Sequence, residues 1–217
     1  MKIKNLKNGF EKLTIAKARI IAHLIGDGCV YKSNHDYNIK YEVKDLESLN
    51  SFEKDMLSVY GLKLTKGFKE SGFTGKPVPF LRLRSKLAYE DLLKYSTYKS
   101  KDWKIKSKIL QSSKQIKKEF LKAFFDDEGS VVPEGKKGII KLYSINKEGL
   151  QQIQKMLLEF DVDSKLDSGY GAKRNVYALL IKDLNKFNKE IGFNLKRKQS
   201  KLKQLRQKYI YSENCLN

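Results

Sequence analysis

One short pattern occurs twice in this chain and restricts the folds that the chain can adopt. The copies are residues 20–28 (IIAHLIGDG) and residues 121–129 (LKAFFDDEG). Each is an apolar helical run that ends in an acid followed by glycine, a residue that often ends helices in the left-handed conformation. The two acids, Asp27 and Glu128, are 101 positions apart (128 minus 27). Two copies at this distance predict a duplicated unit that presents a pair of carboxylates.

The repeat extends beyond the two motifs. The offset of 101 also pairs Asp45 with Asn146, and both residue types favour the N-cap of a helix. Each precedes a segment with apolar residues three and four positions apart, which predicts helices at 46–60 and 147–160. Further along, Lys86 pairs with Lys182 at an offset of 96 (182 minus 86). We therefore expect the second half to be five residues shorter, with the missing residues in the turn that corresponds to residues 71–79 of the first half.

Each half is predicted to contain a helix, two strands, a helix, two strands and a helix. The expected strands are residues 29–33, 37–44, 62–69 and 80–85 in the first half, and 130–133, 138–144, 164–168 and 176–182 in the second. Helices at 87–95 and 183–191 close the halves, and residues 195–208 form a basic helical tail. The predicted class is α+β, with domains at residues 1–105 and 106–217.

The net charge indicates a polyanionic partner. The 217 residues include 45 Lys and Arg against 25 Asp and Glu, which gives a formal charge of +20. So large a surplus repels itself in a compact fold, and nucleic acid is the usual partner. The alternative is an ordinary lysine-rich surface in contact with solvent. Strand alternation favours nucleic acid, because polar residues gather on one face of two predicted strands. On these faces lie Asn38, Lys40, Glu42, Lys44, Arg82 and Arg84.

Other classes of protein are disfavoured. Two Cys and two His cannot form a disulfide framework or a zinc set, and a reducing compartment is expected. The sequence has no apolar run long enough to span a membrane and no signal-peptide core near its start, so we expect an intracellular protein without a membrane partner. No intein splicing ends are recognisable, which favours a free-standing or intron-encoded protein.

The two motif acids suggest a reaction. Each falls at the C-terminal end of a helix, where the helix dipole disfavours a negative charge by about 0.3–1 kcal/mol. Small residues at Ala22, Gly26 and Ala123 would let the two motif helices pack closely, so the acids would converge and a shared cation would offset this cost. Carboxylate and phosphate oxygens suit Mg²⁺. Such a site can activate water against a phosphate, so phosphodiester hydrolysis is predicted.

These residues resemble the LAGLIDADG homing endonucleases, in the single-chain form with two copies of the motif. Residues 101–105, 116–121 and 187–193 also resemble usual segments of that family. The resemblance implies two pseudo-symmetric αββαββα halves, paired motif helices at the core, and a saddle of antiparallel sheets along the DNA major groove. It also implies a site-specific endonuclease that cuts both strands of a long asymmetric site across the minor groove, leaves 3′ overhangs, and propagates the intron or intein that encodes it.

The resemblance further implies which residues act. Asp27 and Glu128 would bind catalytic Mg²⁺ or Mn²⁺, with Gly26 and Asp127 as neighbouring metal-site residues. Lys44 is the nearest match to a basic or amide residue that organises water or stabilises charge, and a plain phosphate contact is its alternative role. The expected DNA-binding residues lie on strands and turns: Tyr31, Lys32, Asn38, Lys40, Glu42, Lys44, Lys66, Lys69, Lys76, Arg82, Arg84, Lys136, Lys137, Lys141, Tyr143, Lys173, Arg174 and Asn175.

Two positions depart from a simple motif. Asp127 stands where a small residue would pack more tightly, so it is also a candidate secondary acid. His23 lies inside the first motif helix and is expected to pack in the core or interface rather than to bind a ligand.

Two other functional classes account for part of the sequence. A non-cleaving relative, either an RNA maturase or a DNA-binding regulator, would keep the basic sheets without needing the acids. A basic structural or ribosome-associated protein would explain the charge but not the matched acids. The expected partner is double-stranded DNA bound by a monomer, with intron RNA as a second candidate partner.

Overall fold

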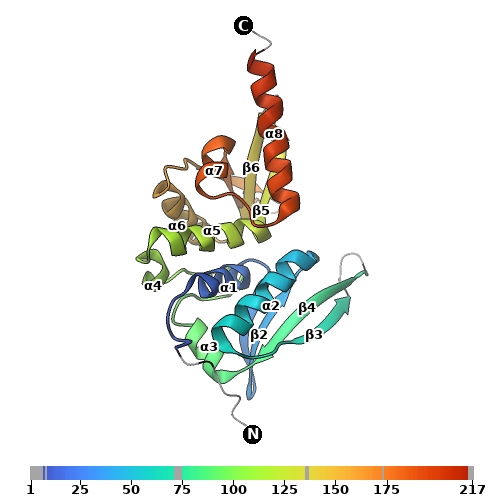
Figure 1. Ribbon diagram of the computed structural model, residues 1–217, viewed down its shortest axis with the longest axis vertical. Helices are drawn as coiled ribbons and strands as arrows, with labels where there is room; N and C mark the ends of the chain where they lie inside the picture. Colours follow the sequence, from blue (N-terminus) through green and yellow to red (C-terminus); the bar gives the residue numbers. More distant parts are fainter. Residues whose placement is uncertain (1–6, 8, 71–74, 135–136, 173, 215–217) are drawn as a thin grey trace. The chain divides into compact units, whose positions relative to one another are not determined.

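A computed structural model describes residues 7, 9–70, 75–134, 137–172 and 174–214 (Figure 1). The chain forms two compact units, Met1–Phe120 and Leu121–Asn217, and the division falls inside helix α5 (Lys114–Glu128). Each unit contains a four-stranded antiparallel sheet with helices packed against it. The predicted α+β class, with helix, hairpin, helix, hairpin and helix in each half, is confirmed.

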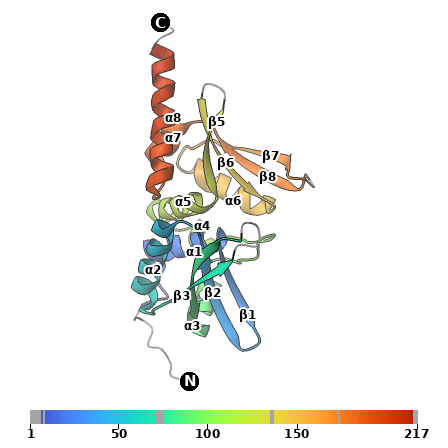
Figure 2. The same cartoon turned by 90° about the vertical axis from the view of Figure 1, so that its right-hand side faces the viewer.

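In the first unit, the chain runs through α1 (Ile15–Ile25), β1 (Gly28–Ser33), β2 (Asp36–Glu42), α2 (Leu46–Tyr60), β3 (Thr65–Glu70), β4 (Pro77–Arg84) and α3 (Lys86–Leu92). The sheet has the order β1-β2-β4-β3, and Figure 2 shows the long hairpin that β1 and β2 form. Helices α1 and α2 pack against each other and against the sheet. A short helix, α4 (Ser107–Leu110), precedes α5.

The first motif helix is buried on almost every side. Thr14 caps α1 by accepting a hydrogen bond from the Lys17 amide, and every residue from 20 to 25 is buried. His23 is 2% exposed, and its Nδ1 lies 3.2 Å from the Tyr41 hydroxyl in a cluster that also contains the Phe52 ring. The prediction that His23 packs in the core is confirmed.

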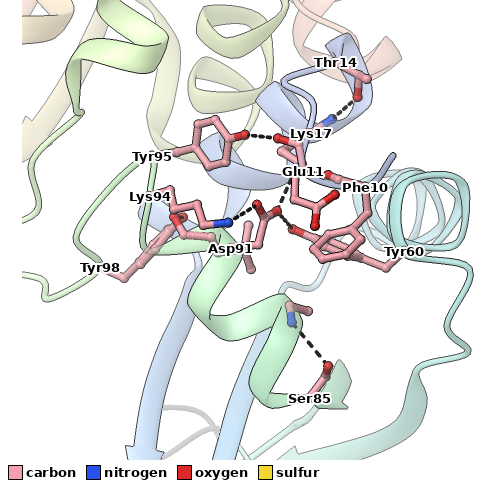
Figure 3. Close-up of polar contacts among 12 residues, drawn as sticks. Phe10, Glu11, Thr14, Lys17, Tyr60, Ser85, Asp91, Lys94, Tyr95 and Tyr98 are labelled. Carbon is pink, nitrogen blue, oxygen red and sulfur yellow. Dashed lines mark hydrogen bonds and ion pairs between the residues drawn. The ribbon is translucent and has the colours of Figure 1, made fainter. Parts of the chain in front are cut away.

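Ion pairs of Lys17 and Arg19 fix α1 within its unit. Lys17 and Asp91 are each at most 1% exposed, and the Lys17 ammonium lies 2.6 Å from the carboxylate of Asp91 in α3 (Figure 3). The Tyr60 hydroxyl also donates to Asp91, at 3.0 Å. Burial lowers the pKa of Lys17, although the hydrogen bond and charge of Asp91 act in the opposite direction. Arg19 binds both carboxylate oxygens of Asp55 in α2, at 2.8 and 2.7 Å, so that α1 is held from both neighbouring helices.

The second unit repeats the same order of elements. The end of α5 leads into β5 (Gly129–Glu134), β6 (Lys137–Ser144), α6 (Lys147–Leu158), β7 (Lys165–Tyr170), β8 (Val176–Ile181) and α7 (Leu184–Glu190). Its sheet has the matching order β5-β6-β8-β7. The basic tail forms helix α8 (Lys196–Asn214), which packs along β5 and β6 (Figure 1).

The strand registers confirm the repeat and correct its later part. Gly28 pairs with Tyr41, and Gly129 pairs with Leu142, so the offset of 101 holds through the first hairpin of each unit. In the second hairpins, Thr65 pairs with Arg82 and Lys165 with Leu180, which gives offsets of 100 (165 minus 65) and 98 (180 minus 82).

The proposed match between Lys86 and Lys182 is therefore wrong. The N-caps of α3 and α7, Ser85 and Asp183, are 98 positions apart (183 minus 85). The second half lacks three residues by this point (101 minus 98), one before β7 and two in the following hairpin. The two lysines share a side-chain type, but the backbone register places them at different positions of the unit.

Candidate active site and nucleic-acid interface

The first motif acid lies in the turn between α1 and β1. Gly26 caps α1 with its amide, which donates to the carbonyl of Ala22 at 3.0 Å. Asp27 follows and is exposed, while its own carbonyl accepts from the amide of Glu42 at 3.3 Å. The backbone of Asp27 is thus tied to the end of β2, while the residue itself is exposed.

Both motif glycines are required by crowding rather than by a left-handed backbone. Neither Gly28 nor Gly129 has a positive φ angle, so the predicted left-handed helix ending is wrong at both. A Cβ atom at Gly28 would lie 2.6 Å from the Cα of Leu24, and one at Gly129 would lie 2.7 Å from the carbonyl oxygen of Phe125. Each strand therefore leaves its motif helix at a distance that only glycine permits.

The second motif acid is the last residue of α5. Glu128 and the preceding Asp127 are half-buried. Asp126 is 3% exposed, and its carboxylate accepts hydrogen bonds from the amides of Asn194 and Leu195, at 3.0 and 3.1 Å. These amides precede α8, so Asp126 connects the end of the motif helix to the start of the C-terminal helix.

A buried lysine from α8 completes this connection. Lys198 is 9% exposed, and its ammonium donates to the carbonyls of Asp126 and Gly129, both at 2.5 Å, and of Phe125 at 3.1 Å. The carbonyl of Asp127 lies 3.3 Å from the same nitrogen. A cation at the C-terminal end of a helix is favourable because the carbonyls carry partial negative charge. Lys198 thus stabilises the backbone that presents Glu128.

The sequence patterns did not identify Lys198 and pointed instead to Lys44. Strand β2 ends at Glu42, two residues earlier than expected, because Asp45 already caps α2. Lys44 therefore lies in the connection to α2 and is exposed. Lys198 is 70 positions beyond Glu128 (198 minus 128), and the only local signal for it was the density of lysines at the start of the tail.

The polar face of the first sheet brings many of the predicted DNA-binding residues together. The register pairs Lys40 with Cys29 on one side and with Arg82 on the other, so these three side chains share a face. Asn38 and Arg84 are also paired, as are Asn38 and Tyr31. Lys69, on the edge strand β3, also lies on this face, where it pairs in register with Val78 of β4. We call the face that carries Tyr31, Asn38, Lys40, Glu42, Lys69, Arg82 and Arg84 the first polar face.

Charges on the first polar face are partly paired. The Lys40 ammonium lies 2.5 Å from the Glu42 carboxylate and 4.4 Å from the centre of the Phe80 ring. Lys69 lies 3.7 Å from the same carboxylate. Partial burial alone would raise the pKa of Glu42, but the hydrogen bond and charge of Lys40, together with Lys69, outweigh it and lower that pKa. The Nε atom of Arg82 is buried without a hydrogen-bond partner in the described residues.

The corresponding face of the second sheet is less basic. Lys141 pairs in register with Ser130 and Leu180, and it is the repeat equivalent of Lys40 at the offset of 101. Its ammonium lies 3.1 Å from Glu134, whose hydrogen bond raises the pKa of Lys141. Tyr143 is 42% exposed on the same face and packs against Tyr170 with ring centres 5.4 Å apart. Leu180 here occupies the position that Arg82 has in the first sheet.

Several other residues predicted to bind DNA lie away from these two sheet faces. Lys66 pairs in register with Leu81, on the side of the sheet that faces the helices, and its ammonium lies 2.6 Å from Glu53 of α2. Lys32 at the end of β1 lies 5.4 Å from the Tyr37 ring centre. Exposed turn positions are held by Lys76, Arg174 and Asn175, and Lys137 begins β6. Lys136 and Lys173 lie outside the described residues.

The acidic side chains at the two motif ends are possible ligands for a metal ion. In the described part of the chain, no group of three or more His, Cys, Asp or Glu side chains is arranged to hold a metal. The first motif end offers the carboxylate of Asp27, and the second offers the carboxylates of Asp127 and Glu128. Mg²⁺ is commonly bound by one or two carboxylates together with waters and substrate phosphates, whereas zinc needs a closed set of nitrogen and sulfur ligands. The residues present therefore fit Mg²⁺ or Mn²⁺ shared with a phosphate.

Among the helices that the structure describes, none has the length and apolar character needed to cross a membrane.

Comparison with known proteins gives a family match for the second motif. Residues 115–192 match a family model described as a LAGLIDADG-like domain. The probable translation initiation factor IF-2 of Methanocaldococcus jannaschii is 28% identical over 198 residues, which cover 88% of this chain and 16% of that protein. Elongation factor 2 of Methanopyrus kandleri is 34% identical over 95 residues, which cover 44% of this chain and 7% of that protein. The chain thus spans only a small part of these relatives.

Solved structures share the fold. The homing endonuclease I-DmoI in complex with DNA and Mn has a TM-score of 0.58 at 17% identity, covering 83% of this chain and 97% of its own. The homing endonuclease I-WcaI bound to its DNA recognition sequence has a TM-score of 0.64 at 16% identity, covering 88% and 87%. Full-length DUF199/WhiA from Thermatoga maritima has a TM-score of 0.62 at 12% identity, covering 97% and 63%.

Proposed function

We propose that this chain is a site-specific endonuclease of the LAGLIDADG type, which hydrolyses both strands of double-stranded DNA. The observation that carries the proposal is the duplicated motif end. Asp27 and Glu128 occupy the same position of two units whose first hairpins keep one register, and each acid directly precedes the first strand of its sheet. One acid for each DNA strand is the arrangement that double-strand cleavage needs.

DNA would bind along the polar faces of the two sheets. Lysine and arginine contacts to phosphates supply affinity, and contacts to base edges in the major groove supply specificity. The two faces differ, because the first carries Arg82 where the second carries Leu180. A DNA-binding surface with two different halves favours a long, asymmetric target bound by a monomer.

Asp27 and Glu128 are the residues that would hold Mg²⁺ or Mn²⁺, with Gly26 and Asp127 beside them. The bound cation would neutralise charge on the phosphate and promote attack by water. The acids supply the negative charge that this cation needs, and the exposure of Asp27 leaves its carboxylate accessible to a DNA phosphate. Cleavage across the minor groove with 3′ overhangs, and a role in propagating an intron or intein, belong to the same proposal.

Basic residues near the acids would complete the site. Lys198 would hold the end of α5 in place and offset the negative carbonyls beside Glu128. Lys40 and Lys141 lie in equivalent positions, each opposite the residue two places after a motif acid, and would face the phosphates of a bound duplex. Lys44, which is exposed beyond β2, suits a phosphate contact better than a role beside the metal.

A cleavage assay tests the proposal. The substrate is DNA in which the sequences that flank the coding element are joined as if the element were absent. We expect Mg²⁺-dependent double-strand cleavage by the wild-type protein. Asp27→Asn and Glu128→Gln should each reduce cleavage at least about 100-fold, because each removes a charge needed at the reacting phosphate, while duplex affinity changes little. Asp163→Asn, an exposed carboxylate distant in sequence from both motifs, is the charge-matched control.

The alternative is a non-cleaving DNA-binding protein on the same fold. It would bind the duplex with or without the acids, and both substitutions would leave its behaviour unchanged. Tight, specific binding without cleavage in Mg²⁺ or Mn²⁺ would decide for this alternative and against the endonuclease.

A further inference from the structure

We propose that a groove beside the second motif acid binds a phosphate of the DNA backbone through Arg197 and Lys201. The groove lies between β5 and the first turns of α8 and has a volume of about 350 Å³. Residues 129–132 line one side, and Arg197, Lys198 and Lys201 line the other. We call it the α8 groove. The proposal rests on the proposed function, because the phosphate would belong to the DNA that is cut.

The lining of the α8 groove is strongly cationic. Three of its seven residues are basic and none is acidic. Lys198 is buried and directs its ammonium to the backbone carbonyls at the end of α5. Arg197 and Lys201 are exposed and four residues apart, so they lie on the same side of α8. Two cations at this spacing can contact one phosphate or two successive phosphates.

The opposite wall is the open edge of a sheet. In the order β5-β6-β8-β7, strand β5 has a neighbour on one side only. The carbonyl of Gly129 accepts from Lys198, so the outer edge of β5 faces α8 at this point. In an antiparallel strand, the N–H and C=O groups of one residue point to the same side, and the side alternates from each residue to the next. Val131 is two residues after Gly129, so its amide points to this outer edge too. The groove therefore combines side-chain cations with a main-chain donor.

The position of the groove favours a DNA phosphate. It begins at the residue that follows Glu128, so a strand held at that acid would continue past the groove. Arginine presents donors in a planar fork that suits phosphate oxygens, and lysine adds a mobile charge. Such contacts fix the position of the duplex and carry no base preference. In the first unit, the helix after α3 is the four-residue α4, so this contact belongs to the second half.

The test compares the double variant Arg197→Gln/Lys201→Gln with wild-type protein. Affinity for the target duplex is measured by fluorescence anisotropy between low and moderate salt, with Ca²⁺ in place of Mg²⁺. Each phosphate contact contributes about 0.9 to the slope of log affinity against log salt. We expect the slope to decrease by about 1–2 and affinity to decrease to a similar extent on target and non-target duplexes. Phosphate ethylation should also lose its interference at the contacted phosphate.

The matched control is Lys196→Gln/Lys203→Gln, which removes two exposed charges of α8 that do not line the groove. Its slope should stay close to that of the wild type. If the salt slope of the groove variant were unchanged, or if the control lost as much, the proposal of phosphate binding in the α8 groove would be overturned. The endonuclease proposal would stay intact. Wild-type protein that binds no duplex would overturn both. Circular dichroism confirms that these surface variants are folded.

Discussion

The ammonium of Lys198 lies 2.5 Å from the carbonyl oxygen of Gly129, the residue that follows the second motif acid. Together with its bonds to the last turn of α5, this contact places a buried cation where the helix dipole disfavours the charge of Glu128. In the described residues of the first unit, α3 is followed by the four-residue α4, so no long helix occupies the place that α8 has in the second unit. The environments of the two motif acids are therefore not equivalent.

Replacing this lysine should separate cleavage from binding. In Lys198→Met, several buried carbonyls lose their donor, so the free energy of unfolding should decrease by about 1–3 kcal/mol. The end of α5 would then hold Glu128 less firmly, and we expect cleavage of the target to slow at least about 10-fold. Duplex affinity measured in Ca²⁺ should change less. Lys203→Met, an exposed lysine of the same helix, is the control, and cleavage by Lys198→Met at the wild-type rate would contradict the assigned role.

The repeated architecture could be predicted from the sequence because it depends on local patterns. Apolar periodicity and the caps Asp45 and Asn146 predicted the helices, and both side chains do cap α2 and α6. Strand alternation predicted that Asn38, Lys40 and Glu42 share a face. The offset of 101 holds in the strand registers because these elements follow the motifs without insertions.

Features that depend on contacts between distant segments could not be predicted. Lys198 reaches the end of α5 only through the packing of α8, which no periodicity encodes. The offset in the later part of each unit is set by strand pairing, so the match of Lys86 with Lys182 by residue type is wrong. The sequence predicts that Gly28 serves a left-handed helix ending. The structure instead requires glycine there because β1 starts close to Leu24, and this contact depends on the packing of β1 against α1.

The stability of the first unit should depend on Glu42 at low pH. Lys40 and Lys69 lower the pKa of Glu42 despite its partial burial, so the folded state favours the carboxylate. Its stabilising contribution is complete above the pKa of the unfolded chain, about 4.3, and is lost as the pH falls through the lower folded value. Urea unfolding between pH 5.5 and 3 should therefore show a smaller loss of stability in Glu42→Gln than in wild type.

The control for this measurement is Glu90→Gln, an exposed carboxylate that lies 3.7 Å from Lys86 on α3. It removes one surface charge from the same unit without touching the first polar face. If both variants lost stability with the same pH dependence as the wild type, Lys40 and Lys69 would not favour the Glu42 carboxylate in the way the geometry indicates.

The motif glycines should tolerate no side chain, because in both units the strand starts too close to the motif helix. In Gly28→Ala, the new Cβ would lie 2.6 Å from a backbone atom of Leu24, so the start of β1 must move away from α1. Overpacking of this kind costs about 1–3 kcal/mol, and Gly129→Ala should behave alike because its nearest atom is the backbone oxygen of Phe125. The displacement would carry the adjacent acid with it, so cleavage should decrease more than duplex binding. Urea unfolding and cleavage rates check both effects, with the exposed Ser33→Ala as control. Wild-type stability in both glycine variants would show that the strands can move without cost.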